Sequence, residues 1–239
     1  MLEKTRGIVL KLTAYGDSSV IAAIYTESFG LQSYMVHGAK KPRAKVRINM
    51  LQPLQLLDMV VHRKANTNLQ RIAEVQLAPS FVSIPYDMAK STVVMFINEV
   101  LYKVLKHQDA DAPLFQFAFN AISWLDSVER MPADFHLYFL MRMTRFLGFQ
   151  PDRREVGSNY FDLKDGLFLK SMPSHPLVLA EPYVSLFNQL CTSTIEELSD
   201  IRMSREQRNV LLDKILEYYR LHVHIGEIKS HAILVEVLS

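Results

Sequence analysis

The sequence predicts an α+β protein in which a small antiparallel β-barrel, residues 1–80, precedes a mostly helical region, residues 81–239. Short segments rich in Val, Ile, Tyr and Thr fill the first part of the chain, with turn-forming residues between them. After Pro85 the apolar residues recur with helical spacing instead. The charge changes in the same region: residues 1–80 hold 11 Lys/Arg and 5 Asp/Glu, a net charge of +6, whereas residues 81–239 hold 16 and 20, a net charge of −4.

Five segments are predicted as strands, and Gly, Asn, Asp or Pro stands at the breaks between them. The strands are expected at Gly7 to Tyr15, Ser18 to Thr26, Leu31 to His37, Leu51 to His62 and Leu69 to Leu77, with breaks at 16–17, 27–30, 38–47 and 65–68. Five short antiparallel strands in about 75 residues fit a closed barrel of the OB kind.

The fifth predicted strand indicates which of its residues face the barrel core. Leu69, Ala73, Val75 and Leu77 are expected to point inward, and Gln70, Glu74 and Gln76 are expected to point to water. The pair Arg71-Ile72 interrupts this alternation.

The second region is predicted to be helical, with one small hairpin. Three apolar stripes have helical spacing and are interpreted as core rather than as a cofactor site. Helices are expected again near Pro182 and from Arg205, and a hairpin is expected from Asn159 to Lys170, within an insertion at about 152–173. The stripes are Val93, Ile97, Val100, Leu101, Val104 and Leu105; Phe115, Ala118, Phe119, Ile122 and Leu125; and Leu137, Leu140, Met141 and Leu147.

The connection at residues 38–47, here named the basic loop, holds five cations and no acid. They are Lys40, Lys41, Arg43, Lys45 and Arg47, with Pro42 among them. Cations that cannot pair within their own segment are free to neutralise a polyanion and release its counterions. Most basic runs are only solvated loop faces, and the loop taken alone leaves that alternative open.

Motifs for catalysis or metal binding are absent from the sequence. It has no His-Glu-x-x-His, P-loop or Gly-x-Ser-x-Gly motif, and its single cysteine, Cys191, can form neither an internal disulfide nor a zinc-binding cysteine set. His222 and His224 are interpreted as structural. The apolar stretches are too short to span a bilayer and no signal sequence is visible, so a soluble cytoplasmic protein without cofactors is expected.

Several segments together resemble a known family. Arg6 to Lys11, Tyr15 to Ser19, Tyr25 to Gly30, His37 to Pro42 and Leu51 to Leu54 are similar, in order and spacing, to the amino-terminal domain of the bacterial recombination mediator RecO. Phe146 to Pro151 and Ile225 to Ser230 resemble the helical carboxy-terminal domain of that family. Many members carry four zinc-binding cysteines after the Leu-Gly-Phe-x-Pro segment, whereas residues 152–173 contain none here, so no zinc is predicted.

The resemblance implies a protein of recombinational DNA repair that is not an enzyme and is nucleoid-associated. It implies binding of single- and double-stranded DNA through the OB domain, annealing of complementary strands, and help in loading the recombinase RecA. It also implies two partners, RecR and the carboxy-terminal tail of the single-strand-binding protein. The candidate DNA-binding residues are Arg6, Lys11, Tyr34, Lys40, Lys41, Arg43, Lys45, Arg47, Arg63, Lys64 and Arg71, with Tyr15 as a further possible base stacker; Tyr15 and Tyr34 could equally pack in the barrel.

Two other classes of function stay open at this point. An OB barrel with a basic loop could bind RNA as well as DNA. Nothing in the sequence distinguishes the two by recognising the 2′-hydroxyl of RNA. Alternatively, scattered histidines and acids could meet in the folded protein to form a hydrolase site.

Overall fold

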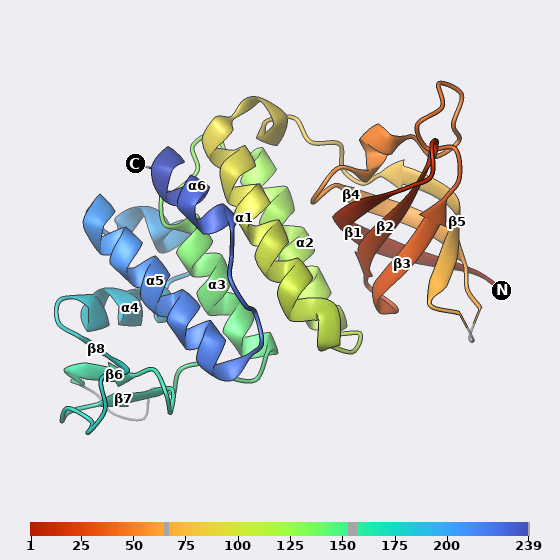
Figure 1. Ribbon diagram of the computed structural model, residues 1–239. Coiled ribbons are helices and arrows are strands. Elements are labelled where there is room, and N and C mark those ends of the chain that lie inside the picture. The colour runs from red at the N-terminus through yellow and green to blue at the C-terminus, as the bar shows by residue number, and fades with distance from the viewer. Residues whose placement is uncertain (65–66, 153–156, 239) are drawn as a thin grey trace. The chain divides into compact units, whose positions relative to one another are not determined.

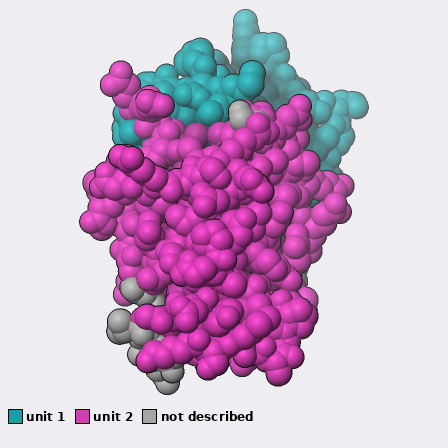
Figure 2. All heavy atoms as spheres, turned by 90° about the vertical axis from the view of Figure 1, so that its left-hand side faces the viewer, with its two compact units in different colours: residues 1–128 teal, residues 129–239 magenta. Residues whose placement is uncertain are grey.

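The computed structural model describes residues 1–64, 67–152 and 157–238. By packing, the chain divides into two compact units, Met1–Val128 and Glu129–Ser239, which Figure 2 colours separately. The first unit holds the strands of the amino-terminal part and two helices, and the second holds the remaining helices and a small sheet. No helix among the described residues has the length and apolar character needed to cross a membrane.

The predicted five-stranded barrel is confirmed (Figure 1). The strands close in the order β1-β2-β3-β5-β4; all neighbours are antiparallel except β3 and β5, which pair in parallel. β5 ends close to residue 80, where the sequence predicts the barrel to end. The strands are β1 (Leu2–Tyr15), β2 (Ser19–Thr26), β3 (Gly30–Val36), β4 (Leu56–His62) and β5 (Leu69–Leu77).

Two strands differ from their predicted bounds by more than one residue. β1 begins five residues early because Leu2 to Arg6, although polar in pattern, pair with β4 from His62 to Asp58. The predicted fourth strand begins late: residues 48–51 form a 3-10 helix, and β4 starts only at Leu56. Pro53 has no N–H for a ladder, and Leu54 adopts a positive φ of 59°, so the chain cannot be extended there.

The predicted inward face of β5 is wrong at its beginning. Gln70 is buried, whereas Leu69 is 37% exposed. Three hydrogen bonds within the protein take the place of the bonds that the Gln70 amide would make to water. Its Oε1 accepts from the Lys64 N–H at 3.0 Å, and its Nε2 donates to the carbonyls of Lys64 and Thr67 at 3.0 and 2.7 Å. The register shift between Val60 and Val61 of β4 reverses the alternation, so Val75 does face the core.

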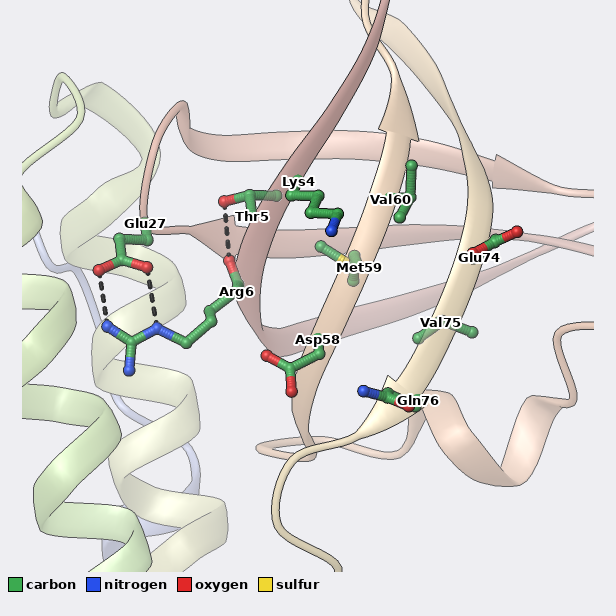
Figure 3. A pocket seen from close by; sticks show the side chains of 10 residues that line it. All are labelled: Lys4, Thr5, Arg6, Glu27, Asp58, Met59, Val60, Glu74, Val75 and Gln76. Atoms are coloured by element: carbon green, nitrogen blue, oxygen red, sulfur yellow. Dashed lines mark hydrogen bonds and ion pairs between the residues drawn. The ribbon is translucent and has the colours of Figure 1, made fainter.

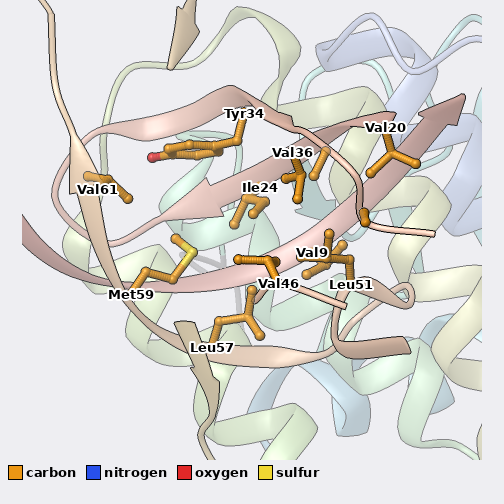
Figure 4. Close-up of a cluster of buried hydrophobic side chains, with 12 residues drawn as sticks. Val9, Val20, Ile24, Tyr34, Val36, Val46, Leu51, Leu57, Met59 and Val61 are labelled. Atoms are coloured by element: carbon orange, nitrogen blue, oxygen red, sulfur yellow. The ribbon is translucent and has the colours of Figure 1, made fainter. Parts of the chain in front are cut away.

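The barrel interior is a cluster of β-branched and aromatic side chains (Figure 4). Gly7 admits this packing, because a Cβ there would lie 2.7 Å from both Ile24 Cγ2 and Met59 Cε. Tyr34, Val36 and Val46 belong to the same cluster. The barrel therefore has a filled core, and its binding surfaces must lie on the outside or at the ends.

Helices α1 (Met88–Val104) and α2 (Ala112–Ser127) complete the first unit. Asp87 and Asp111 cap them, each accepting a hydrogen bond from a backbone N–H in the first turn. Asn98 of α1 donates to the Leu10 carbonyl at 2.9 Å, and the Tyr25 hydroxyl donates to the Asp111 carbonyl at 2.9 Å. These bonds attach the helices to the outer side of β1 and β2.

The second unit contains α3 (Phe135–Phe146), α4 (Tyr183–Thr192), α5 (Arg205–His222) and α6 (Ser230–Val237). The predicted hairpin is confirmed as β6 (Tyr160–Asp162) and β7 (Leu167–Leu169), although residues 153–156 of the insertion lie outside the described residues. A third strand, β8 (Val178–Ala180), pairs with β6 and was not predicted, and neither was α6. The hairpin makes apolar contacts within itself and with α4: the Phe161 ring lies 4.8 Å from the Phe168 ring and 4.5 Å from the Phe187 ring.

Candidate nucleic-acid interface

The basic loop is anchored at both ends and exposed along its charged stretch. Ala39 and Val46 are buried in the barrel core, 2% and 8% exposed, and the Ile48 N–H donates to the Ala39 carbonyl at 3.1 Å. Gly38 opens the loop with a φ of +65°, a conformation that favours glycine. Between these anchors the cations Lys40, Lys41, Arg43, Lys45 and Arg47 are all exposed.

These five cations have no acidic partner among the residues that the structure describes. The backbone of the loop, in contrast, is well bonded, because the Ala44 N–H donates to the Lys41 carbonyl at 3.1 Å. The loop therefore presents uncompensated positive charge on a fixed backbone, which is the electrostatic requirement for a phosphate-binding segment.

Tyr15 lies at the same end of the barrel as the basic loop. It pairs with Ser19 at the end of the β1–β2 hairpin, and the Lys40 N–H donates to the Ser18 carbonyl at 3.2 Å. Tyr15 is 55% exposed, so its ring is available for base stacking. Tyr34 is only 1% exposed and packs in the core, where a base has no access to its ring.

Arg6 is engaged inside the first unit. Its Nε and Nη2 donate to the two Glu27 carboxylate oxygens at 2.8 and 2.6 Å, and Nη2 also donates to Gln116 Oε1 at 2.6 Å. The guanidinium lies 4.9 Å from the ring centroid of Phe119. Hydrogen bonding from Arg6 lowers the pKa of Glu27 below its ordinary value. These bonds use the donors that a phosphate would need.

Arg6 and Glu27 line a cleft of about 620 Å³ on the side of β1, β4 and β5 (Figure 3). Asp58 and Glu74 also line it, with Lys4 as the remaining cation. Because Arg6 is already paired with Glu27, acids outnumber available cations in the cleft. The cleft therefore disfavours a phosphate backbone.

Arg63, Lys64 and Arg71 lie outside the basic loop, on or next to β4 and β5. Arg63 and Lys64 follow β4 at the opposite end of the barrel, and the Arg63 N–H donates to the Met1 carbonyl at 3.0 Å. The Arg63 guanidinium lies 4.6 Å from the ring centroid of Phe29. Arg71 is exposed on β5, opposite Met35 of β3. The candidate cations thus form separate groups rather than one cluster.

Lys11 has a neighbour that the sequence analysis missed. Its Nζ lies 5.1 Å from the centroid of the Tyr102 ring on α1, and the Lys106 Nζ lies 4.9 Å from the same centroid. Lys106 follows Tyr102 by four residues, and this helical spacing was the one signal in the sequence for a contact between their side chains. Nothing in the sequence placed either residue beside β1.

The histidine–carboxylate pairs do not support a hydrolase site. His175 lies 3.1 Å from Asp162, and His231 lies 3.1 Å from Asp213, but none of the four lines the cleft of Figure 3. The Asp162 carboxylate also accepts from the backbone N–H of Lys164, which fixes the hairpin turn. His222 is structural, as predicted: its ring stacks on Phe149 with 5.2 Å between centroids.

Comparison with known proteins identifies the family. The model of the RecO amino-terminal domain, "Recombination protein O N terminal", matches residues 1–81, and the model of the carboxy-terminal domain matches residues 85–232. Proteins named DNA repair protein RecO are similar over nearly the whole chain: that of Phocaeicola vulgatus is 35% identical over 241 residues, covering 100% of both chains. That of Bacteroides fragilis is 36% identical with 93% of each chain covered, and that of Flavobacterium psychrophilum is 33% identical with 99% covered. The chain therefore belongs to the RecO family of DNA repair proteins.

Proposed function

We propose that the chain binds single- and double-stranded DNA through its barrel, with the basic loop as the principal phosphate contact. As a RecO family member it takes part in DNA repair and recombination in a non-enzymatic role. The observation that carries the proposal is the set of five exposed cations without an acidic partner among the described residues. Arg71 and Tyr15 are secondary candidates, whereas Tyr34 is left out because it is buried and Arg6 because its Nε and Nη2 are bonded to Glu27 and Gln116.

The proposal extends to strand annealing and to loading of the recombinase on DNA coated with single-strand-binding protein. Two complementary strands repel each other, and a cationic surface that screens their charge lowers this repulsion without a nucleotide cofactor. The family resemblance further supports RecR and the tail of the single-strand-binding protein as partners, RecA as an indirect one, and a cytoplasmic, nucleoid-associated location. In this proposal residues 1–80 supply the principal DNA contacts, and the contacts with proteins come from residues 81–239.

Neutralising part of the basic loop tests DNA binding. The triple variant Lys40→Gln/Lys41→Gln/Arg43→Gln should bind single-stranded DNA more weakly than the parent protein. It should also flatten the dependence of log affinity on log salt by about 2 units, since each single-strand phosphate contact contributes about 0.7. Fluorescence anisotropy with an oligothymidylate at several salt concentrations measures both quantities.

A matched control removes the same charge elsewhere. Lys164→Gln/Lys170→Gln/Arg202→Gln changes three exposed cations of the second unit and should leave the salt dependence unchanged. Equal behaviour of the two triple variants would mean that the loop is only a solvated face. The same pair of variants in an annealing assay with strands coated by single-strand-binding protein tests the wider proposal, and competition by RNA of the same sequence tests the choice of nucleic acid.

A further inference from the structure

Two lysines converge on one aromatic ring where α1 meets the barrel. Lys11 comes from β1 and Lys106 from the turn after α1, and both are exposed. Their distances to the Tyr102 centroid are 5.1 and 4.9 Å, so both ammonium groups lie beside one ring. Neither ammonium group has an acidic partner in the described part of the chain. Two like charges beside one ring concentrate positive potential there, and an anion bound near both gains from each of them.

The Tyr102 ring restricts the positions of both ammonium groups. A cation is attracted to the electron-rich face of an aromatic ring, and long lysine side chains lose freedom when they make such contacts. The neighbouring Lys103 differs, because its Nζ lies 2.9 Å from the Glu99 carboxylate. Lys11 and Lys106 are therefore prepared for an anionic ligand, whereas the charge of Lys103 is already compensated.

An exposed row of β1 side chains connects this pair to the end of the barrel that carries the basic loop. Leu12 packs against the core and pairs with the buried Ala22, so Lys11, Thr13 and Tyr15 point to the outer face. All three are exposed. Lys11 and Tyr15 are four residues apart, about 13 Å at the usual strand rise. Lys11 lies at one end of this row and Tyr15 at the other. Tyr15 borders the β1–β2 turn, where the Lys40 N–H donates to the Ser18 carbonyl.

We infer that a single DNA strand bound at the basic loop continues past Tyr15 along this row and is held at its far end by Lys11 and Lys106. This inference rests on the proposed function. The occupant is single-stranded because its bases are free to stack on Tyr15, whereas a duplex keeps its bases inside. Lys11 and Lys106 contact phosphate, and Tyr102 is a positioning residue that holds their ammonium groups. The DNA surface therefore extends from the barrel onto the end of α1.

Oligonucleotide length separates this path from binding at the loop alone. Oligothymidylates of about 4 to 16 nucleotides cover the range of site sizes seen for OB domains. The variant Lys11→Gln/Lys106→Gln should match the parent protein on the shortest oligonucleotides, which the basic loop alone can hold. On the longest it should bind more weakly, with a salt slope lower by about 1.4 because two phosphate contacts are lost.

Single substitutions test the roles of the ring and of each charge. Tyr102→Phe keeps the ring and should retain parent affinity, whereas Tyr102→Leu should weaken binding to long oligonucleotides only. Lys103→Gln removes the same charge as Lys106→Gln from the neighbouring turn and should leave the salt slope unchanged. The variant Lys11→Arg/Lys106→Arg should bind as the parent does, which guards against an effect of misfolding.

The inference and the proposed function fail in different ways. If Lys11→Gln/Lys106→Gln keeps the parent affinity and salt slope on long oligonucleotides while the loop triple variant loses them, the path is overturned and the function stands. If the parent protein shows no salt-dependent DNA binding, the proposed function is overturned together with the path.

Discussion

The basic loop and the cleft on β1, β4 and β5 belong to the same barrel, and each contains arginine in a different setting. In the loop, Arg43 is exposed and has no acidic partner among the described residues. In the cleft, Arg6 donates hydrogen bonds to Glu27 and Gln116. Charge counted along a sequence therefore does not measure charge available to a ligand. The number of acidic partners within the fold decides whether a cation stabilises the protein or binds an anion.

The largest difference between the two regions should appear in stability. Arg6→Ala removes a bidentate ion pair, the bond to Gln116 and the stacking on Phe119, and should lower the free energy of unfolding of the first unit by about 1.5–3 kcal/mol, the range for hydrogen bonds to charged groups. Arg43→Ala should change it by less than about 0.5 kcal/mol, as is usual for an exposed residue without partners. Urea unfolding of both variants measures the two values. Equal losses would show that the loop arginine also has a structural role.

The Arg6–Glu27 pair should also make stability depend on pH, with a smaller effect. The pKa of Glu27 lies below its ordinary value of 4.5 in the folded protein, mainly through the bonds from Arg6. The stabilisation is therefore complete above pH 4.5 and is lost as the pH falls through the lowered pKa. Glu27→Gln should cost about 1 kcal/mol near neutral pH, within the range for one hydrogen bond.

Unfolding of the parent protein and of Glu27→Gln between pH 3 and 7 checks this sign. The difference between them should shrink toward zero at the acidic end. If the difference in unfolding free energy between the two proteins does not change with pH, the charge of Glu27 contributes nothing to stability and only the shape of its side chain matters. Lys45→Gln, made in parallel, should show no difference from the parent at either end.

Much of the barrel was predictable because its strands follow local rules. The breaks at 16–17 and 27–30 depend on neighbouring residues, and the structure confirms them as the turns between β1 and β2 and between β2 and β3. The inward turn of Gln70 was not predictable, since it depends on an extra β5 residue, Ala73, in the pairing with β4 and on the carbonyls of Lys64 and Thr67. β8 was missed for a similar reason: three residues become a strand only because β6 lies beside them.

The candidate site was likewise predictable only where its features depend on neighbouring residues. The charge of the basic loop was visible because five cations are adjacent in sequence. The engagement of Arg6 by Glu27 and Gln116 was not, because those partners lie 21 and 110 residues away. The convergence of Lys11 and Lys106 on Tyr102 joins a strand and a helix end, so the sequence shows the spacing of Tyr102 and Lys106 but not the position of Lys11 beside them. Local charge is readable from sequence, whereas compensation of that charge is a tertiary property.

The smallest expected effect comes from a single substitution in the basic loop. A single loop substitution, Lys45→Gln, should leave the free energy of unfolding within about 0.5 kcal/mol of the parent value. It should nevertheless lower the salt slope of single-stranded DNA binding by about 0.7, because one phosphate contact is lost. Arg6→Gln should do the reverse and reduce stability without changing the salt slope. If Arg6→Gln flattened the slope while its unfolding free energy stayed at the parent value, the ion pair with Glu27 would have to open on DNA, and the cleft would join the loop as part of the binding surface.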